Sequence, residues 1–150
     1  MINKGIQFEI SVSKYLEANN SIVTKQYPVN ICINSRISKV HKYDFGNNEI
    51  VVECKDYNWT KGHNYANSKI SGINEVMLLF LGTPPKYTKK LFLRLTDKIG
   101  VNNPETIFEY YIRKYQHLIP SGIEIYELDP ITMTVIMWKD GVFLTPCKTA

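Results

Sequence analysis

The sequence lacks the features that mark membrane and secreted proteins. It has no apolar run near the ~20 residues of a membrane-spanning helix, and the longest candidate, Val76–Leu81, is interpreted as a core segment. An acid, Glu9, stands where a signal peptide would carry its apolar stretch. We therefore expect a cytoplasmic protein with no membrane contact.

Cysteine is scarce, and no repeat, low-complexity tract or linker divides the chain. Cys32, Cys54 and Cys147 are an odd number, lie far apart and form no CxxC pair, so we expect neither a disulfide framework nor a structural zinc site. Each is interpreted as a small buried hydrophobe. The 150 residues are expected to form one domain, 1–150.

The composition is that of an ordinary globular protein. Hydrophobic residues make up 44% of the chain and charged residues 21%. Eighteen Lys and Arg against fourteen Asp and Glu give a net charge of +4. This mild excess permits an anionic partner without proving one, so the distribution of charge matters more than its sum.

Hydrophobic periodicity predicts a mixed α/β (α+β) fold. Phe8, Val12, Tyr15 and Leu16 share one face of a helix over Lys4–Ala18. The other expected elements are strands at 21–33, 40–45 and 49–55, a helix at 65–79, a strand at 91–95, a helix from Pro104 to about 117, and strands at 122–128 and 132–138. The order α-β-β-β-α-β-α-β-β indicates a mixed sheet with packed helices.

Gly46-Asn47-Asn48 predicts a tight hairpin turn between the second and third strands. With Asn47 and Asn48 as its central residues, Asp44 pairs with Val51 and is the diagonal neighbour of Glu53, about 7–8 Å away on the same face. A three-residue loop would turn Asp44 to the opposite face.

The third strand carries charge where a Val-rich strand should be buried. Glu49, Glu53 and Lys55 share one face, while Ile50, Val52 and Cys54 share the other. Buried charges must pair or hold a metal. Two carboxylates at this spacing can bridge a hard divalent cation such as Mg²⁺, and an adjacent lysine can stabilise charge on a phosphate or help to deprotonate a water.

Glu9 adds a further acid at the edge of the first helix's apolar stripe. A carboxylate on the core side of a helix needs a partner, which a metal or Lys55 would provide. The alternative is that Glu9 rims the stripe and pairs with a surface lysine.

The spacing of Asp44, eight residues, then Glu53-Cys54-Lys55 resembles the signature of the PD-(D/E)XK nucleases, which have the restriction-endonuclease-like fold. Gly5–Glu9 is similar to that family's first helix, which often contributes a glutamate. Tyr43 stands where the name-giving proline would be. The resemblance implies a mixed β-sheet core of αβββαβ order flanked by helices, with the last helix and strands as additions.

The resemblance also implies a catalytic set of Asp44, Glu53, Lys55 and Glu9. Asp44 and Glu53 would ligate Mg²⁺ together with the backbone carbonyl of Cys54, and Mn²⁺ or Ca²⁺ would substitute in binding. Lys55 would activate or position the attacking water, and Glu9 would act behind these ligands or at a second metal. The reaction would be hydrolysis of phosphodiester bonds in double-stranded DNA.

Basic and polar residues near these acids are candidates for DNA contacts. For the lysines around the double proline, the alternative is that they are ordinary solvated side chains, and for His41 and His63 it is that they are neutral surface residues. Asn30 and Ser38 join the polar residues that would read base edges. The predicted DNA-binding residues are Asn34, Ser35, Arg36, Lys39, His41, Lys42, Lys61, His63, Lys86, Lys89 and Lys90.

Within the family, the compact build and the Asn-, Ile- and Lys-rich composition resemble the intron-encoded homing endonuclease of the PD-(D/E)XK class. This implies a long DNA target and a homo-oligomer, at least a dimer and up to a tetramer. The alternatives are a type II restriction endonuclease, a Holliday-junction resolvase of the same fold, and a non-catalytic DNA-binding module. The last third of the chain is rich in apolar residues, which either form a subunit interface or complete the core. These residues are Phe108, Tyr110, Tyr111, Ile123, Ile125, Tyr126, Ile131, Met133, Val135, Met137 and Trp138.

Overall fold

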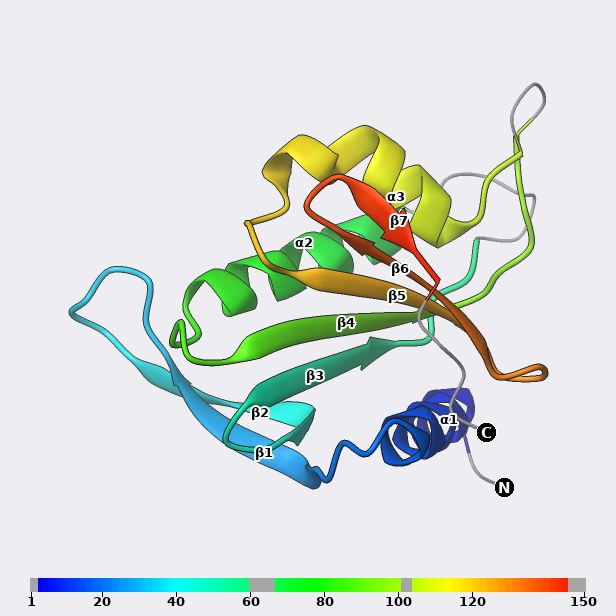
Figure 1. Cartoon of the computed structure of the whole chain (residues 1–150). Helices are drawn as coiled ribbons and strands as arrows, with labels where there is room; N and C mark the ends of the chain where they lie inside the picture. The colour runs from blue at the N-terminus through cyan, green and yellow to red at the C-terminus, as the bar shows by residue number, and fades with distance from the viewer. Residues whose placement is uncertain (1–2, 60–66, 101–103, 146–150) are drawn as a thin grey trace.

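The computed structural model describes residues 3–59, 67–100 and 104–145 (Figure 1). The elements are α1 (Lys4–Ala18), β1 (Thr24–Ile31), β2 (Lys39–Gly46), β3 (Ile50–Lys55), α2 (Asn67–Leu81), β4 (Thr88–Arg94), α3 (Ile107–Tyr115), a 3₁₀ turn (Gln116–Leu118), β5 (Glu124–Asp129), β6 (Thr134–Lys139) and β7 (Val142–Leu144). The mixed α/β class is confirmed.

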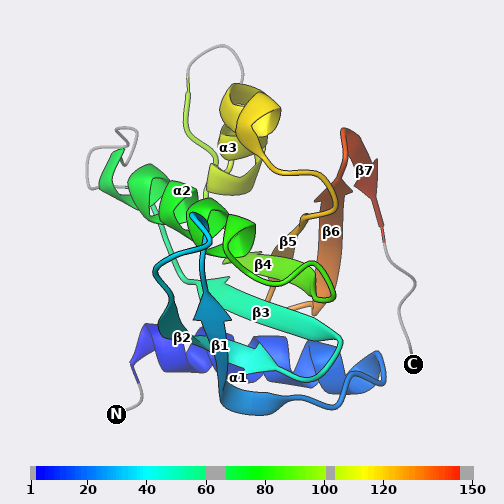
Figure 2. The same ribbon diagram turned by 90° about the vertical axis from the view of Figure 1, so that its left-hand side faces the viewer.

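The strands form one mixed sheet whose order follows the chain from β1 to β7. β3, β4 and β5 run parallel to one another, and the other neighbours are antiparallel. The two parallel connections pass through α2 and α3, as parallel pairing requires. Figures 1 and 2 show α2 and α3 on one face of the sheet and α1 on the other.

Each face of the sheet therefore has its own core. On one side Phe8, Val12 and Leu16 of α1 pack in a cluster with Phe45 and Val52. The bounds predicted for α1 are confirmed. Asn3 caps its start, since the Asn3 side chain accepts a hydrogen bond from the Ile6 N–H at 2.8 Å, and Asn19 caps its end.

On the other side, the core beneath α2 and α3 includes Ile70, Ile73 and Met77, as their helical spacing predicted. Most of the apolar residues in the last third are also buried, so they complete the core. These are Phe108, Tyr110, Tyr111, Ile123, Ile125, Tyr126, Val135 and Trp138, whereas Met133 and Met137 are half-buried and Ile131 is exposed.

The β2–β3 hairpin is present, but its predicted register was wrong by two residues. Phe45 pairs with Val52, and the Asn47 N–H donates to the Ile50 carbonyl at 3.0 Å, so the loop is Asn48-Glu49. The Asn47 Oδ1 accepts from the backbone of Glu49 and Ile50 at 2.7 and 2.9 Å, and this side-chain turn needs no positive φ.

A shift of two residues keeps every side chain on its predicted face. Asp44 therefore stays beside Glu53 and now lies opposite it. Glu49, in contrast, leaves the strand for the exposed turn, so its predicted place in the charged row was wrong. Gly46 packs under the Tyr27 ring, where an added Cβ would lie 2.6 Å from ring atoms.

Two further predictions need correction. Helix α3 begins after Thr106, whose side chain and Glu109 form a capping box, and not at Pro104. The sequence interpretation also missed β7, which follows a turn at Asp140-Gly141 where both residues have positive φ. The predicted start of α2 near residue 65 falls outside the described residues.

Cys32 and Cys54 are free and half-buried, and Cys54 packs against the core beneath α1, in line with its interpretation as a small hydrophobe. Cys147 falls outside the described residues. Among the helices in the described ranges, none combines the length and apolar character needed to cross a membrane.

Candidate active site at the fork between β2 and β3

Strands β2 and β3 separate shortly after their shared turn. In the described chain their ladder consists of Phe45 with Val52 and Gly46 with Val51, after which β2 continues along β1 and β3 along β4. Asp44 and Glu53 face each other where the strands part. The fork therefore leaves backbone groups of both strands without ladder partners.

The carboxylates of Asp44 and Glu53 accept hydrogen bonds from these backbone groups. Asp44 Oδ2 accepts from the Cys54 N–H at 2.7 Å, and Glu53 Oε1 accepts a long hydrogen bond from the Asp44 N–H at 3.4 Å. A buried N–H that lacked such a partner would destabilise the fold, so these contacts fix both side chains in the fork.

The ladder between β1 and β2 is interrupted opposite Asp44. Lys25 pairs with Phe45 and Tyr27 with Tyr43, but Gln26, at φ 54°, has no ladder partner in β2 among the described residues. Tyr43 and Phe45 consequently enter the cores on opposite faces of the sheet, although they are two residues apart. Asp44 thus lies between the faces and contacts acids from both.

The three acids of the predicted set meet at Asp44. The Asp44 carboxylate lies close enough to Glu53 and to Glu9 to act on the pKa of both carboxyl groups. Burial, with the charge of Asp44, raises the pKa of Glu53 to about 8. The same two causes raise the pKa of Glu9, while Lys25 opposes the shift. The cation whose charge acts on Glu9 is thus Lys25 and not Lys55.

Lys55 lies on β3 two residues beyond Glu53, on the same face, and is half-buried. Its Nζ lies 5.8 Å from the centroid of the Tyr57 ring, and its charge opposes the rise in the pKa of Glu53. The Cys54 side chain lies on the opposite face, where burial raises the pKa of the thiol well above its usual range. This thiol is uncharged at neutral pH and is not a thiolate ligand; the role of the Cys54 carbonyl stays a prediction.

His41 lies with the carboxylates and not with the exposed basic residues, among which the sequence interpretation placed it. Its Nε2 lies 3.1 Å from Glu53 Oε2. Burial lowers the pKa of His41, so the imidazole is neutral at neutral pH and the contact is a hydrogen bond.

A cavity of about 520 Å³ opens beside Asp44 between α1 and the β1–β2 hairpin. Glu9 and Asp44 line it together with Lys14, Lys25 and Gln26. The sequence interpretation missed these last three residues because no motif marks them. The pairing of β1 with β2 alone brings Lys25 and Gln26 to this place.

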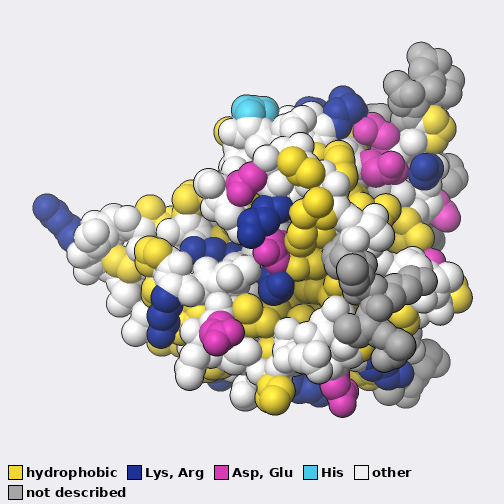
Figure 3. Space-filling view, viewed as in Figure 1, with side chains coloured by type: hydrophobic (Ala, Val, Ile, Leu, Met, Phe, Trp, Pro, Cys, Tyr) yellow, Lys and Arg dark blue, Asp and Glu magenta, His cyan; other side chains and the backbone are white. Residues whose placement is uncertain are grey.

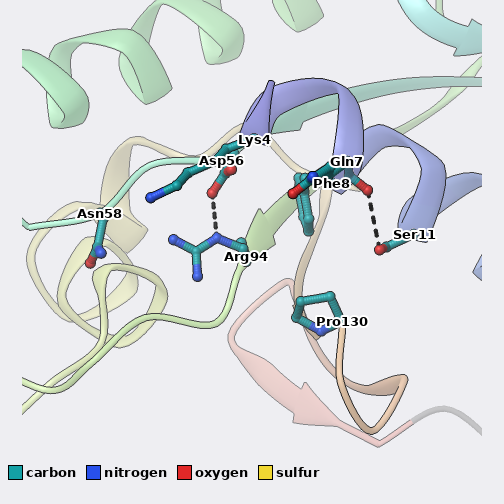
Figure 4. A pocket seen from close by; sticks show the side chains of 8 residues that line it. All are labelled: Lys4, Gln7, Phe8, Ser11, Asp56, Asn58, Arg94 and Pro130. Atoms are coloured by element: carbon teal, nitrogen blue, oxygen red, sulfur yellow. Dashed lines mark hydrogen bonds and ion pairs between the residues drawn. The ribbon is translucent and has the colours of Figure 1, made fainter. Parts of the chain in front are cut away.

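A second cavity, of about 420 Å³, lies along the other flank of α1 (Figure 4). Arg94 donates to the carboxylate of Asp56, the residue after Lys55, and Lys4 projects from α1 beside them. Its lining is Lys4, Gln7, Phe8, Ser11, Asp56, Asn58, Arg94 and Pro130. Cationic side chains thus line cavities along both flanks of α1.

The predicted DNA-binding residues fall into several environments. Arg36, Lys39 and Lys42 are exposed on the projecting β1–β2 hairpin, and Figure 3 shows basic side chains along this projection. Asn34 and Ser35 lie at its end, where Asn34 Oδ1 accepts from the backbone of residues 36 and 37 at 3.0 Å.

The remaining basic residues are farther along the chain. Lys86 is exposed and Lys89 half-buried, whereas Lys90 forms an ion pair with Glu124 at 2.8 Å. The phosphate contacts of all three lysines stay predictions. Lys61 and His63 fall outside the described residues.

Asp44 and Glu53 offer carboxylate oxygens, which are ligands that hard divalent cations prefer. Over the described ranges, no three His, Cys, Asp or Glu side chains already surround a common point as metal ligands do. Asp44 and Glu53 nevertheless lie together as carboxylates, and burial together with their mutual repulsion raises the pKa of Glu53. A divalent cation bound between them would relieve this repulsion.

We compared the chain with protein-family models, with curated proteins and with solved structures, and no match was found in any of the three comparisons.

Proposed function

We propose that this protein is a Mg²⁺-dependent endodeoxyribonuclease of the PD-(D/E)XK type that hydrolyses phosphodiester bonds in double-stranded DNA. The observation that carries the proposal is the meeting of Asp44 and Glu53 at the fork, with Lys55 on the same strand. The order α1-β1-β2-β3-α2-β4 agrees with the restriction-endonuclease-like core that the sequence resemblance implies.

Each residue would have a distinct part in the reaction. Asp44 and Glu53 would hold the cation, which when bound supplies electrophilic stabilisation of the phosphate and favours formation of a hydroxide nucleophile. Lys55 would orient the attacking water or stabilise negative charge as it develops on the phosphate. Glu9, which lines one cavity with Asp44, would act behind the ligands or at a second metal.

The projecting β1–β2 hairpin would supply DNA contacts. Arg36, Lys39 and Lys42 would neutralise phosphates, and Asn34 and Ser35 would face base edges. Because a double-strand cut needs two active sites, the enzyme would act as a homo-oligomer. A homing role with a long target is the proposed biology, and restriction or junction resolution is the alternative use of the same chemistry.

The proposal is tested with Glu53→Gln and, as a matched control, Glu49→Gln in the exposed turn. Each protein is incubated with Mg²⁺ or Mn²⁺ and a supercoiled plasmid library that carries candidate target sequences, and nicked and linear products are quantified. The wild type and Glu49→Gln should cut, whereas Glu53→Gln should lose at least about a hundredfold in rate while still retarding DNA in a gel. Absence of cutting by the wild type, or equal cutting by Glu53→Gln, would overturn the proposal.

A further inference from the structure

His41 differs from its neighbours on β2 in where its side chain lies. Lys39 and Lys42 are exposed, whereas the His41 side chain is 28% exposed and faces the fork. Its Nε2 lies 3.1 Å from Glu53 Oε2. The other charged groups that act on the imidazole are Asp44, Lys55 and Glu75.

The imidazole is supported by a rigid buried ring. The His41 ring packs edge-on against Tyr43, with 4.7 Å between centroids, and Tyr43 stacks on Phe80 of α2 at 5.8 Å. The Tyr43 hydroxyl lies 2.6 Å from Thr83 Oγ1, which lies 2.8 Å from the Leu79 carbonyl and donates to it. This chain of contacts ties the imidazole to the end of α2, so its position does not depend on a flexible surface side chain.

The two oxygens of Glu53 thus have different partners. Oε2 faces His41, while Oε1 faces the backbone of Asp44. With a cation bound, Glu53 would be ionised and would only accept hydrogen bonds, so the imidazole would present its Nε2–H to it. A donor on one oxygen fixes the rotation of the carboxylate and directs the other oxygen to the side where Asp44 lies.

We propose that His41 is a positioning residue that orients Glu53 for cation binding through this Nε2–H···Oε2 hydrogen bond. The inference rests on the proposed function, in which Asp44 and Glu53 hold the cation. Outer hydrogen-bond partners of metal-binding carboxylates fix ligand orientation, and their loss typically weakens metal binding or activity by about 10–100-fold.

The proposal is tested by calorimetric titration of the DNA-free protein with Ca²⁺ and with Mn²⁺. The variants are His41→Ala, His41→Gln, Glu53→Gln and, as an exposed neighbour control, Lys42→Ala. His41→Ala should weaken the binding of both cations by about 10–100-fold. His41→Gln should restore much of the affinity, since its amide N–H can take the place of Nε2–H, and Lys42→Ala should bind as the wild type does.

The outcomes separate this inference from the proposed function. Wild-type affinity for both cations in His41→Ala would overturn the positioning role, provided that Glu53→Gln has lost binding. Loss of Mn²⁺ affinity with unchanged Ca²⁺ affinity would also overturn it, since that pattern marks a direct nitrogen ligand. A wild type that binds neither cation would overturn the proposed function itself. Thermal melting of each variant checks folding, and His41→Gln keeps the test decisive if His41→Ala does not fold.

Discussion

Two buried glutamates of the same sheet have opposite electrostatic surroundings. Glu53 on β3 is 5% exposed and Glu124 on β5 is 9% exposed. Glu124 accepts hydrogen bonds from Lys90 at 2.8 Å, Lys139 at 3.2 Å and the Tyr126 hydroxyl at 2.6 Å. Glu53 meets the carboxylate of Asp44.

The pKa values of the two glutamates follow these partners. Burial alone raises the pKa of Glu124, but the hydrogen bonds from Lys90 and Tyr126 outweigh it and leave that pKa below its usual value. Burial and Asp44 act together on Glu53 and raise its pKa to about 8. Burial is common to both, so the difference lies in the charges that face them: two lysines face Glu124, whereas another carboxylate faces Glu53. A fully paired carboxylate is structural, whereas one that faces other acids retains capacity for a ligand.

The largest change in stability is expected when Glu124 loses its ion pairs with Lys90 and Lys139. Glu124→Gln should lower the free energy of unfolding by about 3 kcal/mol, because it leaves Lys90 partly buried without its counter-ion. Urea denaturation at pH 7 measures the change. In the same assay without divalent cations, Glu53→Gln should not lower the free energy of unfolding. A loss below about 1 kcal/mol for Glu124→Gln would mean that the cluster is not a structural pair.

Divalent cations should stabilise the protein only through Asp44 and Glu53 at the fork. At a concentration one hundred times Kd, Mg²⁺ or Ca²⁺ should raise the free energy of unfolding of the wild type by about 2.7 kcal/mol. Melting curves should show this gain in Glu124→Gln and not in Glu53→Gln or Asp44→Asn. Equal stabilisation of all four proteins would indicate binding elsewhere.

The two glutamates should give opposite dependences on pH. In EDTA, the folded state holds a proton on Glu53 that the unfolded state releases near pH 4.5, so stability should fall as pH rises from about 4.5 through about 8. The slope is at most about 1.4 kcal/mol per pH unit for one group. Glu124, with its lowered pKa, contributes stability that is present above its ordinary pKa and lost in acid.

Urea unfolding measured between pH 4 and pH 8 separates the two contributions. Glu53→Gln should flatten the decline toward pH 8, and Glu124→Gln should flatten the loss toward pH 4. A wild-type curve that is level between pH 5 and pH 8 in EDTA would contradict the raised pKa of Glu53.

The smallest effect concerns the backbone opposite Asp44. Gln26 has φ 54°, a conformation that costs a non-glycine residue roughly 1 kcal/mol. Gln26→Gly should therefore raise the free energy of unfolding by a few tenths to about 1 kcal/mol, since relief of strain exceeds the entropy lost by glycine. Lys25→Gly, at a regular strand position, should lower it. The same sign for both variants in chemical denaturation would refute this account.

Local pattern was enough to predict several elements. Alternation placed Glu53 and Lys55 on one face of β3, and the apolar spacing gave the bounds of α1. The capping box at Thr106 and the Asp140-Gly141 turn were also readable but were missed. These elements depend on residues close in sequence, whose geometry short-range rules describe.

Other features depended on contacts between distant segments. The hairpin register was set by the Asn47 side chain, and the pairing of Lys90 with Glu124 follows from the parallel alignment of β4 with β5. The place of His41 follows from the packing of Tyr43 under α2. Propensity and periodicity carry no information about such long-range choices.

The packing of Gly46 under Tyr27 limits which sequences can maintain this site. Any side chain at position 46 would bring its Cβ to 2.6 Å from the Tyr27 ring, so β1 and β2 would have to move apart. Gly46 pairs with Val51 in the last stretch of ladder before the strands part. A methyl group at this position would thus disturb the spacing of the acids without altering any of them, and mutational intolerance here would reflect steric fit and not chemistry.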